Sequence, residues 1–254
     1  MSLMFTTLVS LSRLRLAIGI AVLPLAVSAT YLVYLNRLVS RLCTASTRLR
    51  DRNKGANRLP PALRKPVTLP QEVEAEESEW ILAYERIASQ PVPRSSIPYD
   101  LKTDLSTVLT HYARATMTAF SWTPQAFLLR ASAGDSAVKK TFDTDFIQNL
   151  AFCEGDRVNG FWRVVYREDS GLSGGGRLEM AMDPPPTYRG PVVRGVVVAG
   201  IELQDDGDLV FVNETWMWRR EEAAPMLLES RLGRLHATLS GWLMMKGVRA
   251  VTHV

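Results

Sequence analysis

Cysteine and histidine are both scarce in this chain of 254 residues, which contains two Cys and three His. Cys43 and Cys153 are far apart in sequence, no CxxC pair occurs, and no histidine stands at metal-ligand spacing from another. Neither a zinc site nor a disulfide framework is therefore indicated. Two lone thiols fit a reducing compartment. We expect no metal ion and no other cofactor.

The motifs of nucleotide and nucleophile chemistry are also missing. The chain has no Walker A loop, no GxGxxG after a predicted strand, no HExxH and no GxSxG. The glycines at 174–176 lack the lysine and the helix of a phosphate loop, so they predict a plain turn. With 46% hydrophobic and 8% aromatic residues, the composition excludes a disordered protein and a transporter with many spans.

Acidic residues are nearly absent from the first 70 positions, where eleven Lys and Arg stand against one acid, Asp51. Because the whole chain carries a net charge of only +4, the remaining body is mildly acidic. The basic residues surround one apolar segment and do not decorate a folded surface. This pattern favours a lipid bilayer as partner and does not favour nucleic acid.

That apolar segment, residues 16–35, has twenty residues without a charge. At about 1.5 Å per residue, a helix of this length just crosses a hydrocarbon core of roughly 30 Å. Tyr31 and Tyr34 fall where an aromatic belt would lie, and Pro24 would kink the helix without forbidding it. Nine basic residues follow the segment before Pro66 and two precede it, so the positive-inside rule places the C-terminal body in the cytosol.

Two other interpretations of this segment stay open. The small residues at 27–29 would also suit cleavage of a secretory signal peptide, although the basic charge downstream opposes translocation. The first fifty residues contain no acid and are rich in Arg, Ser and Thr, which is typical of mitochondrial targeting. We expect a single-pass protein of the endoplasmic reticulum, with the mitochondrial inner membrane as the alternative.

The chain divides by composition into five parts. They are a short N-terminal segment (1–15), a transmembrane helix (16–35), a basic tether with several prolines (36–70), an acidic helix and linker (71–98) and an α+β domain (99–254).

Within the last part, helical spacing predicts helices near 100–120 and from Pro124 onward. Alternating residues rich in Val, Phe, Trp and Tyr then predict four strands, separated by Gly, Pro and Asp turns. These strands are 158–167, 177–183, 192–203 and 208–219. An apolar stripe predicts a last helix from Met226 to about Lys246. The expected fold is α+β: a transmembrane helix, further helices, a curved antiparallel sheet of four or more strands and a long C-terminal helix packed on it.

Several blocks of the last hundred residues carry a resemblance to a known group of proteins. They are 154–156 (EGD), 161–166 (FWRVVY), 188–191 (YRGP), 213–218 (NETWMW) and 241–247 (GWLMMKG). In these blocks the chain resembles uncharacterised membrane-anchored proteins of filamentous fungi, some of which belong to secondary-metabolite gene sets. The order of curved sheet and C-terminal helix is also similar in outline to helix-grip polyketide cyclase and lipid-transfer domains. A curved sheet with a helix laid in its mouth commonly encloses one small apolar ligand. The resemblance itself implies no demonstrated activity.

The strand at 208–219 places a carboxylate among apolar groups. Alternation puts Glu214 on one face with Val210, Val212, Trp216 and Trp218. A desolvated Glu would have a raised pKa and would serve as a general acid or base. Alternatively, Glu214 pairs with Arg163 or Arg194 of a neighbouring strand, or its face meets solvent.

The remaining candidates come from the same strands and from the last helix. Arg163 would bind an anionic group, and His236, at the edge of the apolar stripe, would face a cavity. Alternatively, Arg163 forms a salt bridge at the rim of the domain, and His236 is a solvent-exposed residue beside the apolar stripe. The candidate catalytic residues are therefore Glu214, Arg163 and His236, and the candidate ligand-binding residues are Trp162, Tyr166, Arg194, Trp216 and Trp218. The tryptophans would otherwise belong to the core.

Two functions remain open from the sequence. In the first, the domain binds a small apolar molecule and serves a cyclase, isomerase or dehydratase step of secondary metabolism. In the second, it is a non-catalytic structural or assembly factor of the endoplasmic reticulum or the mitochondrial inner membrane. A pocket lined by Glu214, Arg163 and tryptophans would favour the first, and a filled core with an exposed apolar patch the second.

Overall fold

The computed structural model describes residues 30–50, 64–74, 79–99, 101–169, 175–189, 194–230 and 233–252. The chain forms two compact units, Met1–Arg41 and Leu42–Val254. In the first unit, residues 30–41 are helical. The second unit holds the strands of the described residues and is the α+β body of the protein.

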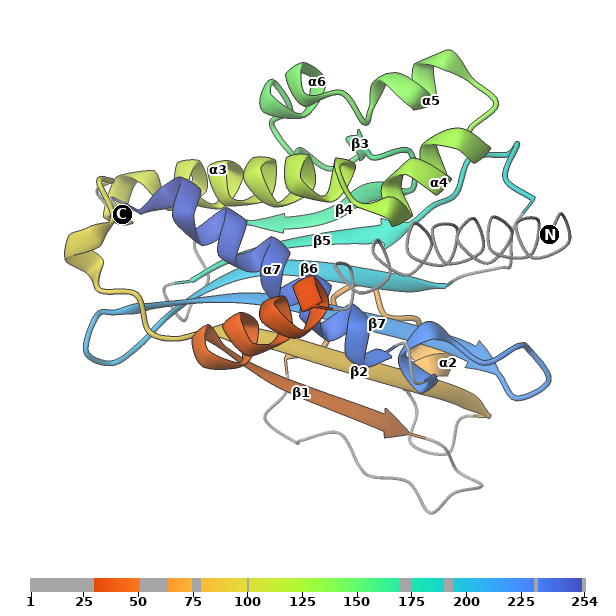
Figure 1. The fold of residues 1–254 in the computed structure, drawn as a ribbon, viewed down its shortest axis with the longest axis horizontal. Coiled ribbons are helices and arrows are strands. Elements are labelled where there is room, and N and C mark those ends of the chain that lie inside the picture. The colour runs from red at the N-terminus through yellow and green to blue at the C-terminus, as the bar shows by residue number, and fades with distance from the viewer. Residues whose placement is uncertain are drawn as a thin grey trace, which may run out of the picture. The chain divides into compact units, whose positions relative to one another are not determined.

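The body is built on a seven-stranded sheet in which every neighbouring pair is antiparallel (Figure 1). The strand order is β1-β2-β7-β6-β5-β4-β3. The strands are β1 (Cys43–Arg50), β2 (Trp80–Ser89), β3 (Arg157–Val158), β4 (Trp162–Glu168), β5 (Gly176–Met182), β6 (Gly195–Leu203) and β7 (Leu209–Arg220). The larger antiparallel sheet expected from the sequence is confirmed.

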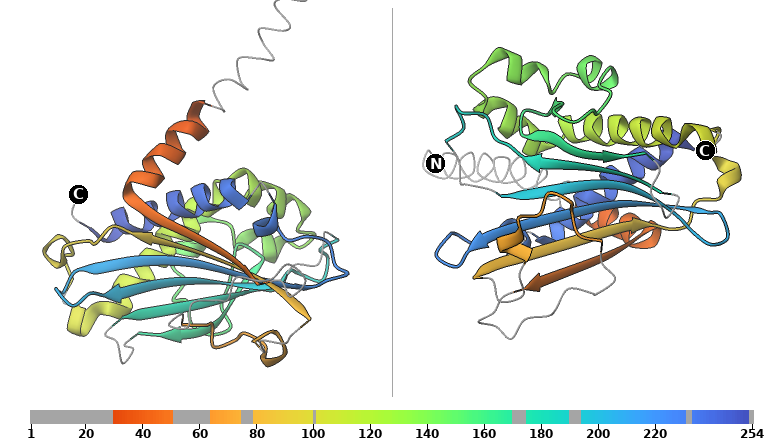
Figure 2. Two further views of the ribbon diagram at one scale, coloured as in Figure 1. Left: turned by 90° about the horizontal axis from the view of Figure 1, so that it is seen from below. Right: turned by 180° about the vertical axis from the view of Figure 1, so that it is seen from behind.

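Helices cover one face of this sheet. The two long ones, α3 (Leu101–Ser121) and α7 (Gly233–Val251), lie over the same face, as the left view of Figure 2 shows. The shorter helices are α2 (Gln71–Glu74), α4 (Pro124–Ser132), α5 (Ser136–Lys140) and α6 (Thr144–Gln148), with single 3-10 turns η2 (Arg94–Ser96) and η3 (Leu227–Glu229). We call the side of the sheet that bears α3 and α7 the helix face.

The opposite side, which we call the strap face, is covered by residues 64–74 including α2 (Figure 2, right). Leu69 and Val73 of this strap pack on a core cluster of the sheet. That cluster consists of Trp80, Leu82, Tyr84, Val196, Val198, Trp216 and Trp218. The sheet is therefore buried on both faces, which requires apolar residues at consecutive positions of its central strands.

The four strands predicted from alternation correspond to β4 to β7, with ends that differ by at most four residues from those expected. The tight turn between β6 and β7 is confirmed: Gly207 adopts a φ of +88° and its N–H bonds the carbonyl of Gln204 at 2.9 Å. Only glycine adopts that backbone conformation without strain, so the turn chemistry fixes this hairpin.

The helix expected within residues 71–89 is wrong for most of its length. Of the described residues in this range, Gln71–Glu74 are helical, and Trp80–Ser89 form the strand β2, between β1 and β7. Its first five residues are all buried because one face packs under the helices and the other under the strap. A continuous apolar run of this kind fits a buried strand as well as a helix, and the preceding glutamates favoured the wrong choice.

The basic tether expected at 36–70 is also wrong in part. Residues Cys43–Arg50 form β1, and each of them pairs with a residue of β2. The strand is mostly exposed and polar, so its sequence shows no apolar period that would predict a strand. It is a strand because its backbone pairs with β2. The α+β body accordingly begins at Leu42 and not at residue 99. The prolines at 60 and 61 lie outside the described residues.

The helices of the body largely agree with those predicted from the sequence. Thr123 caps α4 by accepting the N–H of Ala126, and Asp135 caps α5 in the same way from Ala137. The last helix begins at Gly233 and not at Met226, because the residues after Pro225 form the turn η3 first.

The predicted transmembrane helix lies for the most part outside the described residues, as does the segment 1–15. Within the part of the chain that the structure describes, no helix combines the length and the hydropathy needed to span a bilayer.

Candidate functional site

A cavity of about 760 Å³ lies on the helix face, between the sheet and helices α3, α4 and α7. Most of its wall is apolar. The apolar side chains include Met117, Phe120, Leu129, Phe161, Trp162, Met180, Met182, Val197, Ala199, Met217, Leu239 and Leu243. The volume and lining are those of a site for one small apolar molecule.

The packing of α3 against α7 explains why a space remains here. The two helices approach closely at Gly247, where an added Cβ would lie 2.5 Å from the Tyr112 ring. The cavity is lined by the other end of this pair, through Thr116, Met117 and Phe120 of α3 and the first half of α7. A glycine thus lets the helices touch at one end, while side chains hold them around a cavity at the other.

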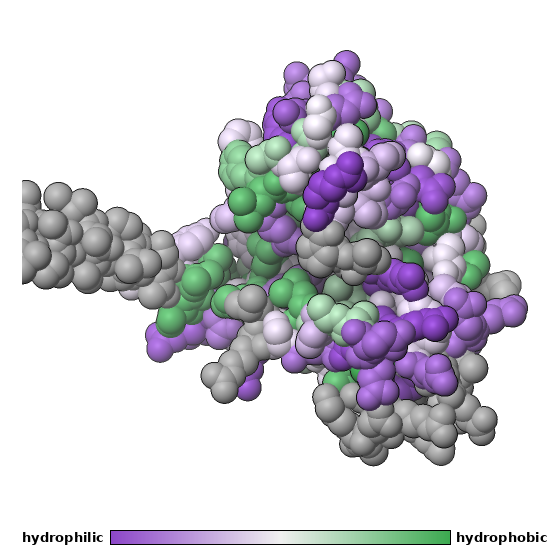
Figure 3. Space-filling view, turned by 90° about the vertical axis from the view of Figure 1, so that its right-hand side faces the viewer, coloured by the Kyte–Doolittle hydropathy of each residue, from purple (hydrophilic) through white to green (hydrophobic). Residues whose placement is uncertain are grey.

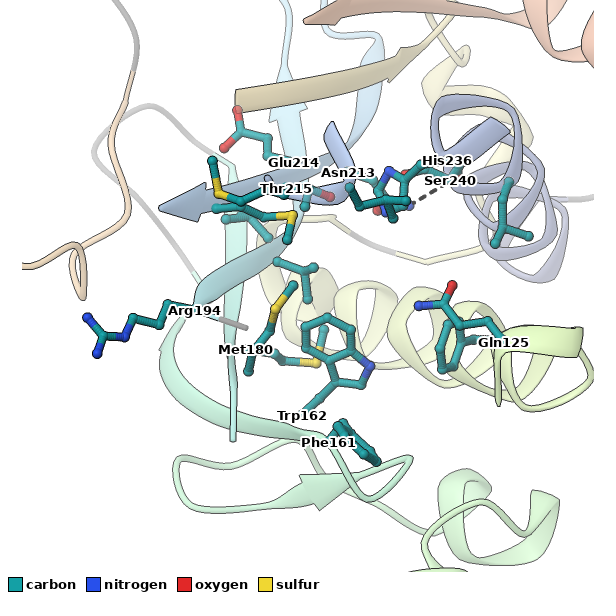
Figure 4. A pocket seen from close by; sticks show the side chains of 18 of the residues that line it. Gln125, Phe161, Trp162, Met180, Arg194, Asn213, Glu214, Thr215, His236 and Ser240 are labelled. Carbon is teal, nitrogen blue, oxygen red and sulfur yellow. Dashed lines mark hydrogen bonds between the residues drawn. The ribbon is translucent and has the colours of Figure 1, made fainter. Parts of the chain in front are cut away.

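Polar groups gather on one wall of the cavity. Asn213 and Thr215 alternate on β7, and His236 and Ser240 stand one turn apart on α7, so all four reach the same wall. Figure 4 shows Asn213, His236 and Ser240 together at one end, with Trp162 and Gln125 across from them. A ligand in this cavity would meet a cluster of hydrogen-bonding groups on this wall, with the Gln125 amide opposite them.

His236 has a buried carboxylate as its partner. Its Nδ1 lies 2.7 Å from Oε1 of Glu85, whose side chain is 1% exposed. Glu85 is the cross-strand neighbour of Thr215, which places it on the helix face next to the polar wall. Its other oxygen, Oε2, is buried and makes no hydrogen bond with any described residue. A carboxylate at Nδ1 favours the tautomer with its proton on that nitrogen and leaves Nε2 as the basic one.

Asn213 is oriented from α3. The hydroxyl of Tyr112 donates to Asn213 Oδ1 at 2.8 Å, and the Asn213 amide nitrogen lies 3.5 Å from the carbonyl of Ser240. Burial raises the pKa of Tyr112 well above its usual value, so its hydroxyl stays a donor. Because Oδ1 accepts this bond, the NH₂ end of the amide is turned to the α7 side of the site.

Glu214 lies on the strap face. Its cross-strand neighbours are Arg86 and Val198, and in Figure 4 its carboxylate points away from Trp162 and Gln125. Oε1 accepts from the Tyr84 hydroxyl at 3.0 Å and from Arg86 at 3.1 Å. Oε2 accepts from Trp216 Nε1 at 3.3 Å and lies 3.5 Å from Arg177. The predicted ion pair of Glu214 with an arginine is confirmed, but the prediction that this arginine is Arg163 or Arg194 is wrong, since the partners are Arg86 and Arg177.

This network neutralises Glu214 and fixes the protonation of its neighbours. Arg86 binds Glu214 and Glu202, and these carboxylates raise the pKa of its guanidinium although burial alone would lower it. Burial and the Glu214 carboxylate raise the pKa of Tyr84. A second cavity of about 530 Å³ lies beside this network, but its three arginines, Arg64, Arg86 and Arg177, already hold carboxylates.

The other predicted site residues lie in different places. Arg163 is half exposed and pairs with Asp183 at 3.0 Å. Tyr166 is partly exposed and outside the cavity wall, since a bulge between Val164 and Tyr166 breaks the alternation of β4. Arg194 is at the cavity rim, where its guanidinium lies 5.1 Å from the Trp80 ring centroid.

Among the predicted tryptophans, Trp162 and Trp218 belong to the cavity lining. Trp216 and Trp218 have their side chains in the core of the strap face. Five of the predicted residues thus belong to the cavity lining: Trp162, Arg194, Glu214, Trp218 and His236. The Glu214 carboxylate is nevertheless bonded on the strap face, and Arg163, Tyr166 and Trp216 lie outside the lining.

Sequence reasoning missed Glu85 and Asn213. Glu85 is the one charged residue inside the apolar run 80–85, and assignment of that run to a strand would have drawn attention to it. Asn213 precedes the predicted Glu214 and alternation places it on the other face of the strand, where its side chain is bonded inside the body. In the part of the chain that is described, no three His, Cys, Asp or Glu side chains are grouped as metal ligands.

Comparison with known proteins leaves the function to be inferred from this geometry. No protein-family model, no curated protein and no solved structure matches the chain.

Proposed function

We propose that this chain is a single-pass membrane-anchored protein whose α+β domain binds a small apolar molecule on its helix face. The observation that carries the proposal is the cavity of about 760 Å³, whose lining is mostly apolar and includes polar groups of β7 and α7. A molecule of this kind partitions into lipid, so an enzyme or carrier held at the bilayer meets it at high local concentration. The reaction class is a cyclase, isomerase or dehydratase step of secondary metabolism.

The orientation follows from the basic residues that flank the apolar segment. They hold the body on the cytosolic side of the endoplasmic reticulum, with the mitochondrial inner membrane as the alternative location.

A substitution that fills the cavity tests the proposal. Val197 is partly exposed on the helix face, between Met180 and Thr215, so Val197→Phe places a ring in the space. We expect the purified full chain to bind the neutral fluorophore N-phenyl-1-naphthylamine saturably, and Val197→Phe to weaken this binding at least about tenfold.

The matched control is Val67→Phe, since Val67 is 62% exposed and outside the cavity wall. This variant should bind the fluorophore as the unsubstituted chain does, and both variants should melt cooperatively. Equal binding by all three proteins would contradict the proposal, because the fluorophore would then sit elsewhere.

A second candidate function rests on a different observation. Trp122, Phe127 and Leu128 are 69%, 53% and 73% exposed at the start of α4, and the face in Figure 3 carries patches of hydrophobic residues. Exposed apolar groups in one place are typical of a binding surface for another protein, which favours a structural or assembly role. Loss of function after Trp122→Ser with Leu128→Ser, and none after Val197→Phe, would favour this second function.

A further inference from the structure

We propose that His236 and Glu85 form an acid–base pair that moves a proton at the carbon next to a carbonyl group of the bound molecule, while Asn213 holds the carbonyl oxygen. The proposal rests on the proposed function, because it assigns chemistry to the same cavity. It names the ligand class as well: an apolar ketone or related carbonyl compound with an acidic C–H bond.

The first argument is the direction of the imidazole. His236 belongs to the cavity wall, and its Nδ1 is engaged by Glu85 at 2.7 Å. Nε2 makes no hydrogen bond with any described residue. A buried carboxylate on one ring nitrogen orients the ring, favours the proton on Nδ1 and stabilises the imidazolium that forms when Nε2 takes a proton. Glu85 is therefore a positioning residue and His236 the catalytic one.

The second argument is the burial of an acceptor that the protein itself leaves unused. Glu85 Oε2 is buried and without a partner among the described residues, although such oxygens are nearly always hydrogen-bonded. A structural role would need only the single bond to His236. A carboxylate that accepts no second hydrogen bond keeps its full negative charge for the imidazole. It therefore stabilises a positive charge on the ring more strongly.

The third argument is the donor beside the imidazole. Tyr112 fixes the Asn213 amide through Oδ1, and the bond from its nitrogen to Ser240 is long at 3.5 Å. An amide N–H of Asn213 is thus available to a ligand oxygen. Figure 4 shows Asn213 and His236 at the same end of the cavity, so an oxygen at the amide brings the adjacent carbon toward the imidazole.

The step is balanced without a co-reactant. His236 Nε2 takes the proton from the α-carbon, the electron pair of the C–H bond forms a carbon–carbon double bond, and the carbonyl π pair moves to oxygen. Asn213 donates to the resulting enolate oxygen. The imidazolium exchanges its Nε2 hydrogen with solvent and then returns a proton, either to the α-carbon or to the γ-carbon of a conjugated chain. The second outcome shifts a double bond and is an isomerisation.

Hydrogen exchange in a simple ketone tests this step directly. We use 2-tetralone, an apolar ketone with exchangeable α-hydrogens, incubate it with the full chain in deuterated buffer and follow deuterium uptake by NMR. The unsubstituted protein should accelerate uptake over buffer containing the same concentration of imidazole. His236→Gln should lower the accelerated rate by about 10²-fold or more, and Glu85→Gln by at least about tenfold.

Control variants separate the pair from general effects of charge and folding. His111→Gln removes a histidine that stacks on Tyr99 outside the cavity wall, and Glu202→Gln removes a carboxylate of the strap face. Both should leave exchange unchanged. Displacement of N-phenyl-1-naphthylamine by 2-tetralone, measured on every variant, should stay within about twofold for Glu85→Gln and so show a folded, intact cavity.

The two proposals fail in different ways. Displacement of the fluorophore by 2-tetralone without faster exchange in the unsubstituted protein would overturn the acid–base pair and leave the proposed binding function standing. The same conclusion follows if Glu85→Gln and Glu202→Gln exchange equally fast. Absence of any saturable fluorophore binding would overturn both proposals.

Discussion

Glu85 and Glu214 lie on neighbouring strands and serve opposite faces of the sheet. Glu85 stands beside Thr215, and the next residue, Arg86, stands beside Glu214. On the strap face Glu214 meets two arginines, a tyrosine hydroxyl and an indole N–H. On the helix face Glu85 meets only His236 among the described residues. A fully neutralised carboxylate holds structure, whereas a carboxylate with one titratable partner is suited to proton transfer.

Glu214→Gln should therefore act on stability. The substitution leaves Arg86 and Arg177 without the carboxylate that lies between them in a site where the Glu214 side chain is 2% exposed. Removing one partner of a buried ion pair costs on the order of 3 kcal/mol. A thermal or urea melt of the full chain should show this loss, with fluorophore binding unchanged at temperatures where the variant is folded.

Glu202→Gln provides the comparison within the same network. Glu202 also binds Arg86, but its side chain is 46% exposed, so solvent screens the pair and the expected loss is below about 1 kcal/mol. Equal losses for the two variants would mean that burial does not govern the strength of this network.

The two thiols should differ in reactivity because of their surroundings. Burial raises the pKa of Cys43 to about 11, and Cys153 is exposed. Only the thiolate reacts, and a group with a raised pKa forms it only as the pH approaches that value. At pH 8 a disulfide reagent such as DTNB should titrate one thiol quickly and Cys43 on the order of 10²-fold more slowly.

Unfolding in guanidinium should remove this difference, and Cys153→Ser should abolish the fast phase. Two equally fast thiols in the native protein would contradict the burial of Cys43.

At the scale of the elements, local chemistry decides which parts of the fold the sequence reveals. Strands β4 to β7 are recognisable because turns with Gly, Pro and Asp separate them and because side chains alternate. Strand β2 is apolar on both faces, so alternation is lost, and β1 is polar and exposed. Both are strands because of partners that are distant in sequence, which a local pattern does not contain.

The candidate site divides in the same way. His236 was identifiable from its place at the edge of an apolar helical stripe. Its partner Glu85 lies 151 positions away and on a strand that the local pattern assigns to a helix. The inward face of β7 was also assigned incorrectly: both faces of this strand carry buried side chains, so alternation alone left Glu214 and Asn213 equally eligible.

The close contact of α3 with α7 should be sensitive to one methyl group. In Gly247→Ala the new Cβ would lie 2.5 Å from both Tyr112 and Thr116, so the helices must move apart. Overpacking of this kind costs about 1–3 kcal/mol, more than the gain in helix propensity. A melt should show the loss, while Ala250→Ser, at an exposed position of the same helix, should change stability by less than about 0.5 kcal/mol.

Because Tyr112 also orients Asn213, Gly247→Ala should in addition change fluorophore binding. An unchanged melt would mean that the helices have room to spare at this point.

At the scale of the whole molecule, the boundary of the folded body has a direct consequence. The compact unit starts at Leu42, and β1 follows at once. Every residue of β1 pairs with β2, whose own first half is buried. Residues 1–41 contain the whole apolar segment 16–35, and they contribute no strand among the described residues. We therefore expect the proposed anchor to be separable from the body at Leu42 but not farther along the chain.

Two truncations test this boundary. Removal of residues 1–41 should give a protein that leaves the membrane fraction, melts cooperatively and binds N-phenyl-1-naphthylamine as the full chain does. Removal of residues 1–66 also deletes β1, so the hydrogen-bonding edge of β2 and the apolar side chains next to it meet water. That shorter protein should aggregate or lose its cooperative transition. If both truncated proteins melt alike, β1 contributes nothing to the stability of the body. If the protein that lacks only residues 1–41 stays with the membrane after a salt wash, part of the membrane attachment lies in the body itself.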